Sequence, residues 1–193
     1  MDTNPTPMTI AEYKAIPHKR RPTTVTITNQ IIPEGCFYGI HDFVSVTLPH
    51  ATSIGPQAFG DCRQLHTLIA PRVTSICAHA FFRCSRLETV IFPALTTAGQ
   101  GAFEACVSMA AISLPNLTTV SRGMFAYCDN LRVANMPKVT RVDAWAFADC
   151  VNLQPPSFMA TVEEIHMSAF RNCRTFKALD MHHLNHLECL AFE

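Results

Sequence analysis

Cysteine and histidine supply most of the reactive and metal-binding chemistry in this sequence, with nine residues of each. Six of the cysteines recur at intervals of 22 or 23 residues, and they are Cys62, Cys84, Cys106, Cys128, Cys150 and Cys173. If successive copies stacked, neighbouring Cα atoms would lie about 5 Å apart, which a disulfide tolerates. However, a buried free thiol behaves as a small apolar side chain, and zinc sites favour ligands a few residues apart. The even spacing therefore predicts structural thiols, while Cys36, Cys77 and Cys189 lie off the series with nothing nearby to activate them.

The densest group of candidate metal ligands lies near the C-terminus. It consists of His182, His183, His186 and Cys189. The two adjacent histidines alternate sides on an extended chain, and no carboxylate is spaced to orient an imidazole. The sequence therefore favours a solvated turn and no bound metal, with a metal site as the less favoured interpretation.

Signatures of catalysis are missing from the sequence. It contains no G-x-S-x-G, no H-E-x-x-H and no G-x-x-x-x-G-K-[ST] motif. Its seven glycines supply few turns that could cradle a phosphate. Pairs such as Cys77 and His79 lack the third group that completes a catalytic triad. We expect a protein that is not an enzyme and needs no cofactor.

The composition narrows the class of protein further. The chain has 193 residues, the size of one domain or one elongated stack. It is 48% hydrophobic and 16% charged, which excludes disorder. Fifteen basic residues balance fifteen acidic ones, so no basic field exists to bind nucleic acid. Without a signal-like apolar stretch or a run of about 18 apolar residues, we expect no membrane span and a cytoplasmic location, with the cell surface as the alternative.

An internal repeat organises the residues described above. Its most regular members are eight phenylalanines spaced by 22 residues, with one step of 23: Phe37, Phe59, Phe81, Phe103, Phe125, Phe147, Phe170 and Phe192. In six copies a cysteine follows three positions after the phenylalanine, and another apolar residue lies three positions further on. Apolar residues at intervals of three predict a short helical turn that docks one side on a core.

Each turn is followed by alternating residues that predict a short strand. The predicted strands are 46–48, 68–70, 90–92, 112–114 and 134–136, and each ends before a proline. A second extended segment with paired apolar residues, such as Val73 with Ile76, completes the unit. Such a unit cannot bury its own apolar face, so we expect the copies to stack into a solenoid. The pattern loses an apolar position to Pro156, and there we expect a local irregularity.

The consensus A-F-x-x-C-x-x-L-x-x-V-x-L-P, followed by L-T-x-I, resembles the BspA-like branch of the leucine-rich-repeat family. It runs from about Pro33 to Phe192. The resemblance implies a leucine-rich-repeat solenoid of the α/β type: a curved right-handed coil of about seven repeats, mostly short parallel strands with helical turns. It also implies that the L-x-x-V-x-L strands line the concave face. Finally, it implies a role in binding proteins or surfaces.

The two ends of the chain differ in pattern. Residues 8–15 predict a short helix and residues 25–28 a strand, so we expect residues 1–32 to cap the first coil. The solenoid is predicted over residues 33–193. It stops within an eighth unit with no polar cap in view, and solenoids need caps. We therefore expect self-association through the C-terminal end.

The candidate binding site is the outward side of the strands. Its central column and charged edge are Thr47, Ile69, Ile91, Ser113, Asn135, His66, Glu88 and Arg132. Apolar Ile69 and Ile91 on a solvent face are typical of a binding surface, although isoleucine also simply favours strand conformation.

These observations favour a protein interaction module that docks a partner of unknown identity on the concave face. Two alternatives remain open. One is a surface or virulence-associated adhesin-like protein, as the resemblance suggests. The other is an accessory subunit of an enzyme complex.

Overall fold

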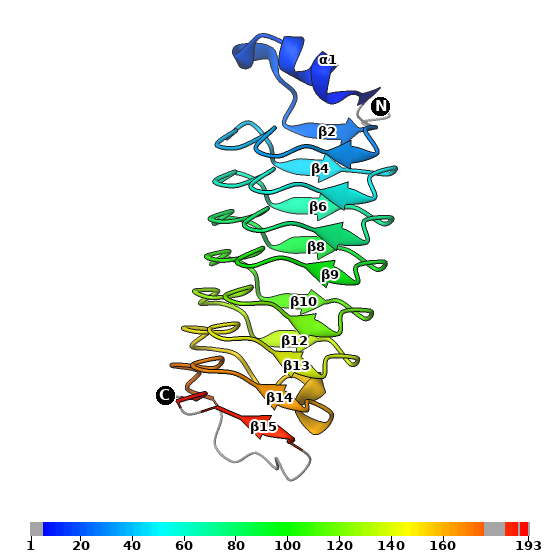
Figure 1. Cartoon of the computed structure of the whole chain (residues 1–193). Coiled ribbons are helices and arrows are strands. Elements are labelled where there is room, and N and C mark those ends of the chain that lie inside the picture. Colours follow the sequence, from blue (N-terminus) through cyan, green and yellow to red (C-terminus); the bar gives the residue numbers. More distant parts are fainter. Residues whose placement is uncertain (1–5, 176–183, 189, 193) are drawn as a thin grey trace.

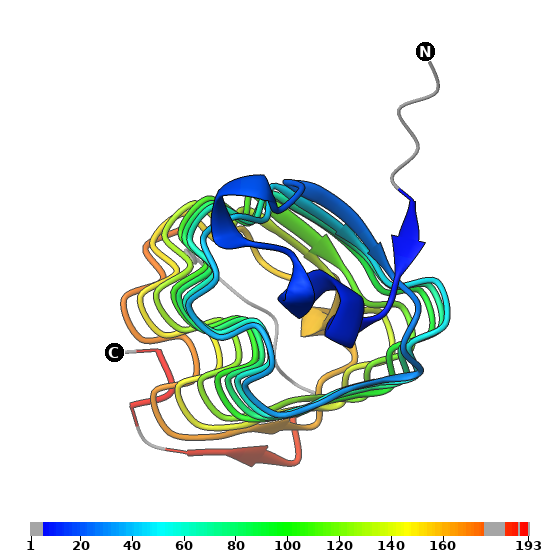
Figure 2. The same ribbon diagram turned by 90° about the horizontal axis from the view of Figure 1, so that it is seen from above.

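The computed structural model describes residues 6–175, 184–188 and 190–192, and the chain forms a stack of parallel coils (Figure 1). Every strand pairing is parallel and joins one coil to the next. The predicted solenoid is therefore confirmed, with about eight turns and few helices. Seen along its axis, successive coils superimpose around a common interior (Figure 2).

Strands of three or four residues form the first row of the stack. This row comprises β2 (Thr24–Ile27), β4 (Ser45–Thr47), β6 (Thr67–Ile69), β8 (Thr89–Ile91), β10 (Ala111–Ser113) and β12 (Val133–Asn135). The middle residue points inward, as buried Val46 and Leu68 do, and its two neighbours point outward. Strands occur one residue earlier than predicted, because the outward residue before the inward one already pairs with the next coil.

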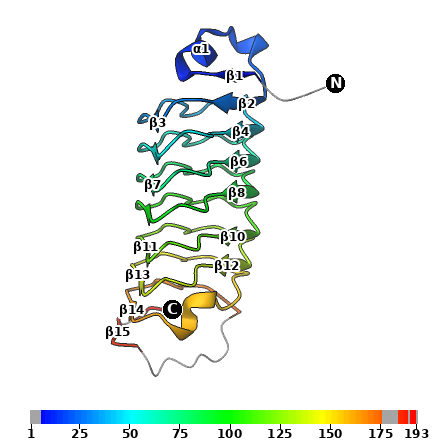
Figure 3. The ribbon, with the colours of Figure 1, turned by 90° about the vertical axis from the view of Figure 1, so that its right-hand side faces the viewer.

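Shorter strands form a second row on another side of the coil (Figure 3). They are β3 (Ile31–Ile32), β5 (Ser53–Ile54), β7 (Ser75–Ile76), β9 (Thr97–Ala98), β11 (Thr119–Val120), β13 (Arg141–Val142), β14 (Glu164–Ile165) and β15 (His186–Leu187). In β5 and β7 the second residue is buried, while the first faces outward. The prediction of a second extended segment is thereby confirmed for residues 73–76, of which the last two form strand β7.

The segment around each phenylalanine is a chain of β-turns. Its helix-like spacing arises from hydrogen bonds to the third preceding residue, as from Cys62 N–H to Phe59 O and from Leu65 N–H to Cys62 O. Residues two before and two after each repeat phenylalanine from Phe37 to Phe170 are left-handed; around Phe59 they are Gln57 (φ 51°) and Asp61 (φ 58°). Alternate N–H groups consequently point along the axis, so that Phe59 N–H bonds Ala80 O in the next coil at 2.8 Å.

These left-handed positions allow a paired test of backbone strain. Ala105 has φ 59° and Gly123, one coil on, has φ 60° with open space where a Cβ would stand. A left-handed conformation costs an L-residue about 1–2 kcal/mol, part of which glycine loses again to backbone entropy. We expect Ala105→Gly to raise the free energy of unfolding by about 1 kcal/mol and Gly123→Ala to lower it by about as much. Urea unfolding of both variants checks this, and shifts of the same sign would contradict it.

The phenylalanines form a continuous stack through the interior. Consecutive rings from Phe37 to Phe192 lie 5.1–5.6 Å apart and are near parallel. The six repeat cysteines and the following leucines form further buried columns beside it. One contiguous core therefore runs the length of the solenoid.

Both rows of strands are interrupted at the same level. Neither β8 with β10 nor β9 with β11 forms a paired ladder, and Figure 1 shows β8 and β10 farther apart than β6 and β8. Phe92 stands between Ala70 and Leu114 at the equivalent positions of the two neighbouring coils, and its ring lies against Phe81 (5.9 Å) and Phe103 (6.1 Å). We call this interruption the seam. The turn ladder crosses it intact, with Phe81 N–H bonded to Ala102 O at 2.9 Å.

A short helix covers the N-terminal end of the stack (Figure 2). Helix α1 (Ile10–Ala15) begins with a capping box between Thr9 and Glu12, and is followed by the 3-10 helix η1 (His18–Arg20). The ring of Tyr13 stacks on Phe43 at 4.8 Å. Strand β1 (Pro7–Met8) pairs with β2. Strands β2 and β3 lie within residues 1–32, the predicted cap, and already pair with β4 and β5. The segment predicted as a cap therefore also contains the first strand of each row.

The irregularity predicted near Pro156 is a second 3-10 helix. Helix η2 (Ser157–Ala160) stands where the first row would continue after β12, since Pro155 and Pro156 cannot donate to a ladder. Phe158 keeps the core filled, with its ring 6.0 Å from Phe147. Among the described residues, β12 is therefore the last strand of the first row, while the second row continues to β15.

Candidate functional site

The repeat cysteines are structural groups. Each thiol donates to the main-chain oxygen of a phenylalanine one coil back, for example Cys62 Sγ to Phe37 O at 3.1 Å and Cys106 Sγ to Phe81 O at 3.3 Å. Burial raises the pKa of Cys62 and Cys128 to about 12 and that of Cys106 well above the ordinary value. These thiols stay protonated at neutral pH. A thiolate is needed for both nucleophilic attack and metal binding, so the column offers neither.

Outward side chains of the first row form a continuous surface, which we call the strand face. It comprises the flanking residues of β4, β6, β8, β10 and β12. The register aligns Thr47, Ile69 and Ile91 in one column. Ser113 and Asn135 form a second aligned pair beyond the seam, where Asn135 Nδ2 donates to Ser113 Oγ at 3.1 Å.

Exposure differs along this column. Ile91 is 44% exposed, whereas the neighbouring Ile69 is half-buried and therefore less exposed than Ile91. Val133, which the predicted set omits, is 55% exposed at the end of the same face. It points outward by the same alternation that places Ile91, so the strand pattern contains the signal for it. Two exposed apolar side chains, Ile91 and Val133, thus lie on opposite sides of the seam.

The charged edge lies at the start of the strands. His66, Glu88 and Arg132 each precede a first-row strand by one residue. The imidazole of His66 is held by a 2.7 Å contact between its Nδ1 and Gln64 O. Arg132 lines a hollow of about 370 Å³ at the end of the row, together with Val133 and Pro155. The structure therefore places all eight predicted side chains on or beside the strand face.

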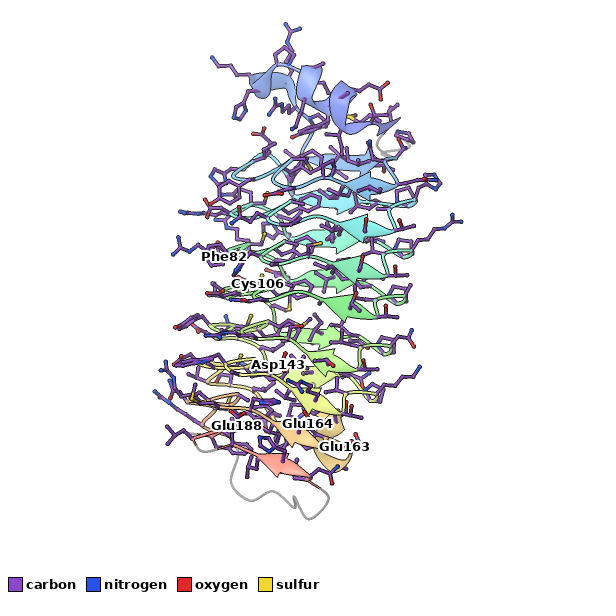
Figure 4. All side chains as sticks on the ribbon, in the orientation of Figure 1. Phe82, Cys106, Asp143, Glu163, Glu164 and Glu188 are labelled. Carbon is purple, nitrogen blue, oxygen red and sulfur yellow. The ribbon has the colours of Figure 1, made fainter. Side chains whose placement is uncertain are left out.

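A second cluster lies on the other row of strands and was not predicted. Glu164 and His166 come from the coil of β14, and His186 and Glu188 from the coil of β15. His166 Nδ1 lies 2.7 Å from Glu188 Oε1, and these contacts with the His166 side chain and the Met167 N–H hold the pKa of Glu188 below its usual value. We call these four residues the His–Glu cluster; Figure 4 labels its two glutamates.

The structure describes one member of the C-terminal group of candidate metal ligands, His186. The other members, His182, His183 and Cys189, lie outside the described residues, and His186 is exposed on β15. The structure brings His186 next to His166 and Glu188. Residues 166 and 188 are one period of 22 apart, so the repeat spacing indicates that their side chains meet, although they are distant along the chain.

Parallel coils with a phenylalanine stack, a cysteine column and a row of short strands define a leucine-rich-repeat solenoid. A family model described as the BspA type leucine rich repeat region matches residues 52–177 in six copies. The chain belongs to this family, so the resemblance stated from the sequence is confirmed. No curated protein matches the chain.

Solved structures of bacterial leucine-rich-repeat proteins share the fold. One from T. pallidum is 26% identical, with a TM-score of 0.74 over 80% of this chain and 78% of its own. A protein from Bacteroides ovatus is 21% identical, with a TM-score of 0.57 over 76% of this chain and 45% of its own. A leucine rich cell surface protein from Faecalibacterium prausnitzii is also 21% identical, with a TM-score of 0.56 over 76% and 56%. This chain thus spans about half of each of the last two.

Among the described residues, none of the helices is long and apolar enough to cross a membrane. The longest, α1, has six residues.

Proposed function

We propose that the protein is a non-catalytic interaction module that docks a partner protein on the strand face. The observation that carries this proposal is the exposure of Ile91 beside Ile69 and of Val133 beyond them. Apolar side chains in solvent are typical of surfaces that become covered on binding. Strand pairing holds Ile69 and Ile91 at fixed spacing on one ladder, so docking there orders few side chains and loses little entropy.

The chemistry of the strand face indicates the kind of partner. The outward residues of β4 to β12 are serine, threonine, alanine, valine, isoleucine and asparagine, and none of them is charged. Charges are confined to the edge, where Glu88 and Arg132 are exposed. An apolar centre with a polar rim is the usual anatomy of a protein–protein interface. A neutral face of this kind lacks the cations that bind nucleic acid.

The test is a charge placed at the centre of the face. Ile69→Asp/Ile91→Asp should abolish partner capture while leaving the far-ultraviolet circular dichroism unchanged, because both side chains point away from the core. Ile31→Asp is a matched control, since Ile31 is 62% exposed on β3 in the second row. Capture from native lysate, read by mass spectrometry, should identify a protein bound by wild type and by Ile31→Asp but not by the double variant. Equal capture by all three would contradict docking on this face.

We place this activity in the cytoplasm, with the adhesin-like surface role as the alternative. The similarity to a cell surface protein of Faecalibacterium prausnitzii is one of fold. Protease treatment of intact cells separates the two locations. A cytoplasmic chain should stay intact until the cells are lysed, whereas cleavage on intact cells would support the adhesin.

A further inference from the structure

The His–Glu cluster has the arrangement of a metal site. In the parallel register, Glu164 lies beside His186, and the next outward pair is His166 beside Glu188. Each coil thus contributes one histidine and one glutamate, in opposite order. Two residues apart on an extended chain, the side chains from each coil point to the same face. The four groups therefore gather on one outward patch that bridges the last two strands.

Distances within the patch bring three ligand atoms together. Glu188 Oε1 lies 2.7 Å from His166 Nδ1 and 3.5 Å from His186 Nε2. One ligand atom from each of these residues lies within 4.8 Å of the other two. Ligands of one tetrahedral Zn²⁺ at bond lengths of about 2 Å are separated by roughly 3–3.5 Å. Small side-chain rotations would therefore bring all three onto a single ion.

Neighbouring groups hold the ligands in place. Met167 N–H donates to Glu188 Oε2 at 2.8 Å, which leaves Oε1 directed at the two imidazoles. On the far side of the His166 ring, Nε2 is buried without a hydrogen bond, and Glu164 Oε2 lies 3.5 Å away. Arg141 Nη1 fixes that carboxylate with a 2.7 Å hydrogen bond. A carboxylate behind a ligating histidine is the usual orienting partner in zinc sites.

We propose that His166, His186 and Glu188 bind one Zn²⁺ ion, with Glu164 as a positioning residue. Two imidazoles and one carboxylate suit zinc, whereas Mg²⁺ and Ca²⁺ need oxygen ligands throughout. The fourth position opens onto a hollow of about 300 Å³ lined by Arg122, Arg141 and Asp143, which has room for water. The bound ion links β14 to β15 and so fastens the coil of β15 to the solenoid.

Metal analysis and calorimetry of the untagged, chelator-treated chain test the proposal. We expect one Zn²⁺ per chain by elemental analysis, no uptake of Mg²⁺ or Ca²⁺, and no detectable Zn²⁺ binding by Glu188→Gln or His166→Asn. Glu163→Gln, at the exposed neighbour of Glu164, is the matched control and should bind like wild type. Removing the positioning carboxylate should have a smaller effect than removing a ligand, and we expect Glu164→Gln to weaken Zn²⁺ binding about 10-fold.

Two further readouts separate this site from the tail residues. His182→Ala/His183→Ala/Cys189→Ser should keep full binding, and the Co²⁺-substituted protein should show a ligand-field band without thiolate charge transfer. Zn²⁺ should also slow hydrogen exchange at the amides of His186 and Glu188, which bond Glu163 O and Ile165 O across the two coils. Binding lost in the tail variant but kept in Glu188→Gln would overturn the proposal, as would no Zn²⁺ uptake by wild type.

Discussion

Replacing Phe103 with alanine should lower the free energy of unfolding by about 3–5 kcal/mol. The Phe103 ring is fully buried and stacks on Phe81 at 5.3 Å and on Phe125 at 5.6 Å. Its removal leaves a cavity inside the stack that the backbone ladders on either side prevent from closing. Chemical unfolding followed by circular dichroism measures the loss, provided that the denaturant dependence is unchanged.

A second phenylalanine provides the matched control. Phe82, labelled in Figure 4, follows Phe81 in the coil before that of Phe103; it is half-buried, and its ring contacts His79 at 5.7 Å and the Arg83 guanidinium at 4.8 Å. Phe82→Ala should cost about 1 kcal/mol, since less apolar area returns to water. If both substitutions cost the same, the phenylalanine stack would not be the dominant packing element.

Raising the pH from 8 to 10 should destabilise the protein by several kcal/mol through its cysteine column. Burial keeps the six repeat thiols protonated in the folded chain, with pKa values of about 12 for Cys62, Cys128 and Cys173 and values raised well above normal for the others. In the unfolded chain a thiol ionises near pH 8.5. The folded chain therefore keeps protons that the unfolded chain releases. The contribution of the thiols to the free energy of unfolding is fully present below about pH 8.5 and is lost as the pH rises. Each thiol contributes about 1–2 kcal/mol of loss at pH 10.

Serine variants isolate this effect. Cys84→Ser/Cys106→Ser/Cys128→Ser keeps a donor for each phenylalanine carbonyl but removes three of the seven thiols with a raised pKa, Cys36 being the seventh at about 11, so the loss between pH 8 and pH 10 should fall by about two-fifths. Tyr13, whose pKa is also raised to about 12 by burial, is present in both proteins and cancels. Urea unfolding under reducing conditions gives the pH dependence of stability for both proteins. Should the triple variant not fold, Cys106→Ser alone should reduce the loss by about a seventh. Identical pH dependence in variant and wild type would contradict the proposed origin.

The repeat was predictable because its cause is local and recurs. A phenylalanine every 22 residues with a cysteine three positions later leaves one way to bury both, and the stacked rings and buried thiols follow. The left-handed residues were not predictable. Glycine marks them at Gly101 and Gly123, but Ala105 and Trp145 adopt the same conformation because pairing between coils imposes it. The seam was not predictable either, because the loss of pairing between two neighbouring strands becomes visible only in the packed structure.

The two sites differ in what the sequence could reveal about them. Alternation along each strand identified Ile69 and Ile91 as outward, although it could not show that Ile91 is the more exposed of the two. The two pairs of residues in the His–Glu cluster are far apart along the chain, because in a solenoid the neighbours in space lie one period away. His166 and Glu188 meet only because β14 and β15 stack in register.

The seam also divides the mechanics of the molecule. In a linear array, cooperativity spreads from one repeat to the next through the interface between them. Between β8 and β10 that interface rests on the turn ladder and the ring stack, without a strand ladder. We therefore expect unfolding of one strand block to separate from that of the other at Phe92, where the turn ladder and the ring stack join the two blocks. Any change in the gap at the seam would alter the separation of Ile91 from Ser113, and with it the curvature that the strand face presents to a partner, while the phenylalanine stack stays continuous.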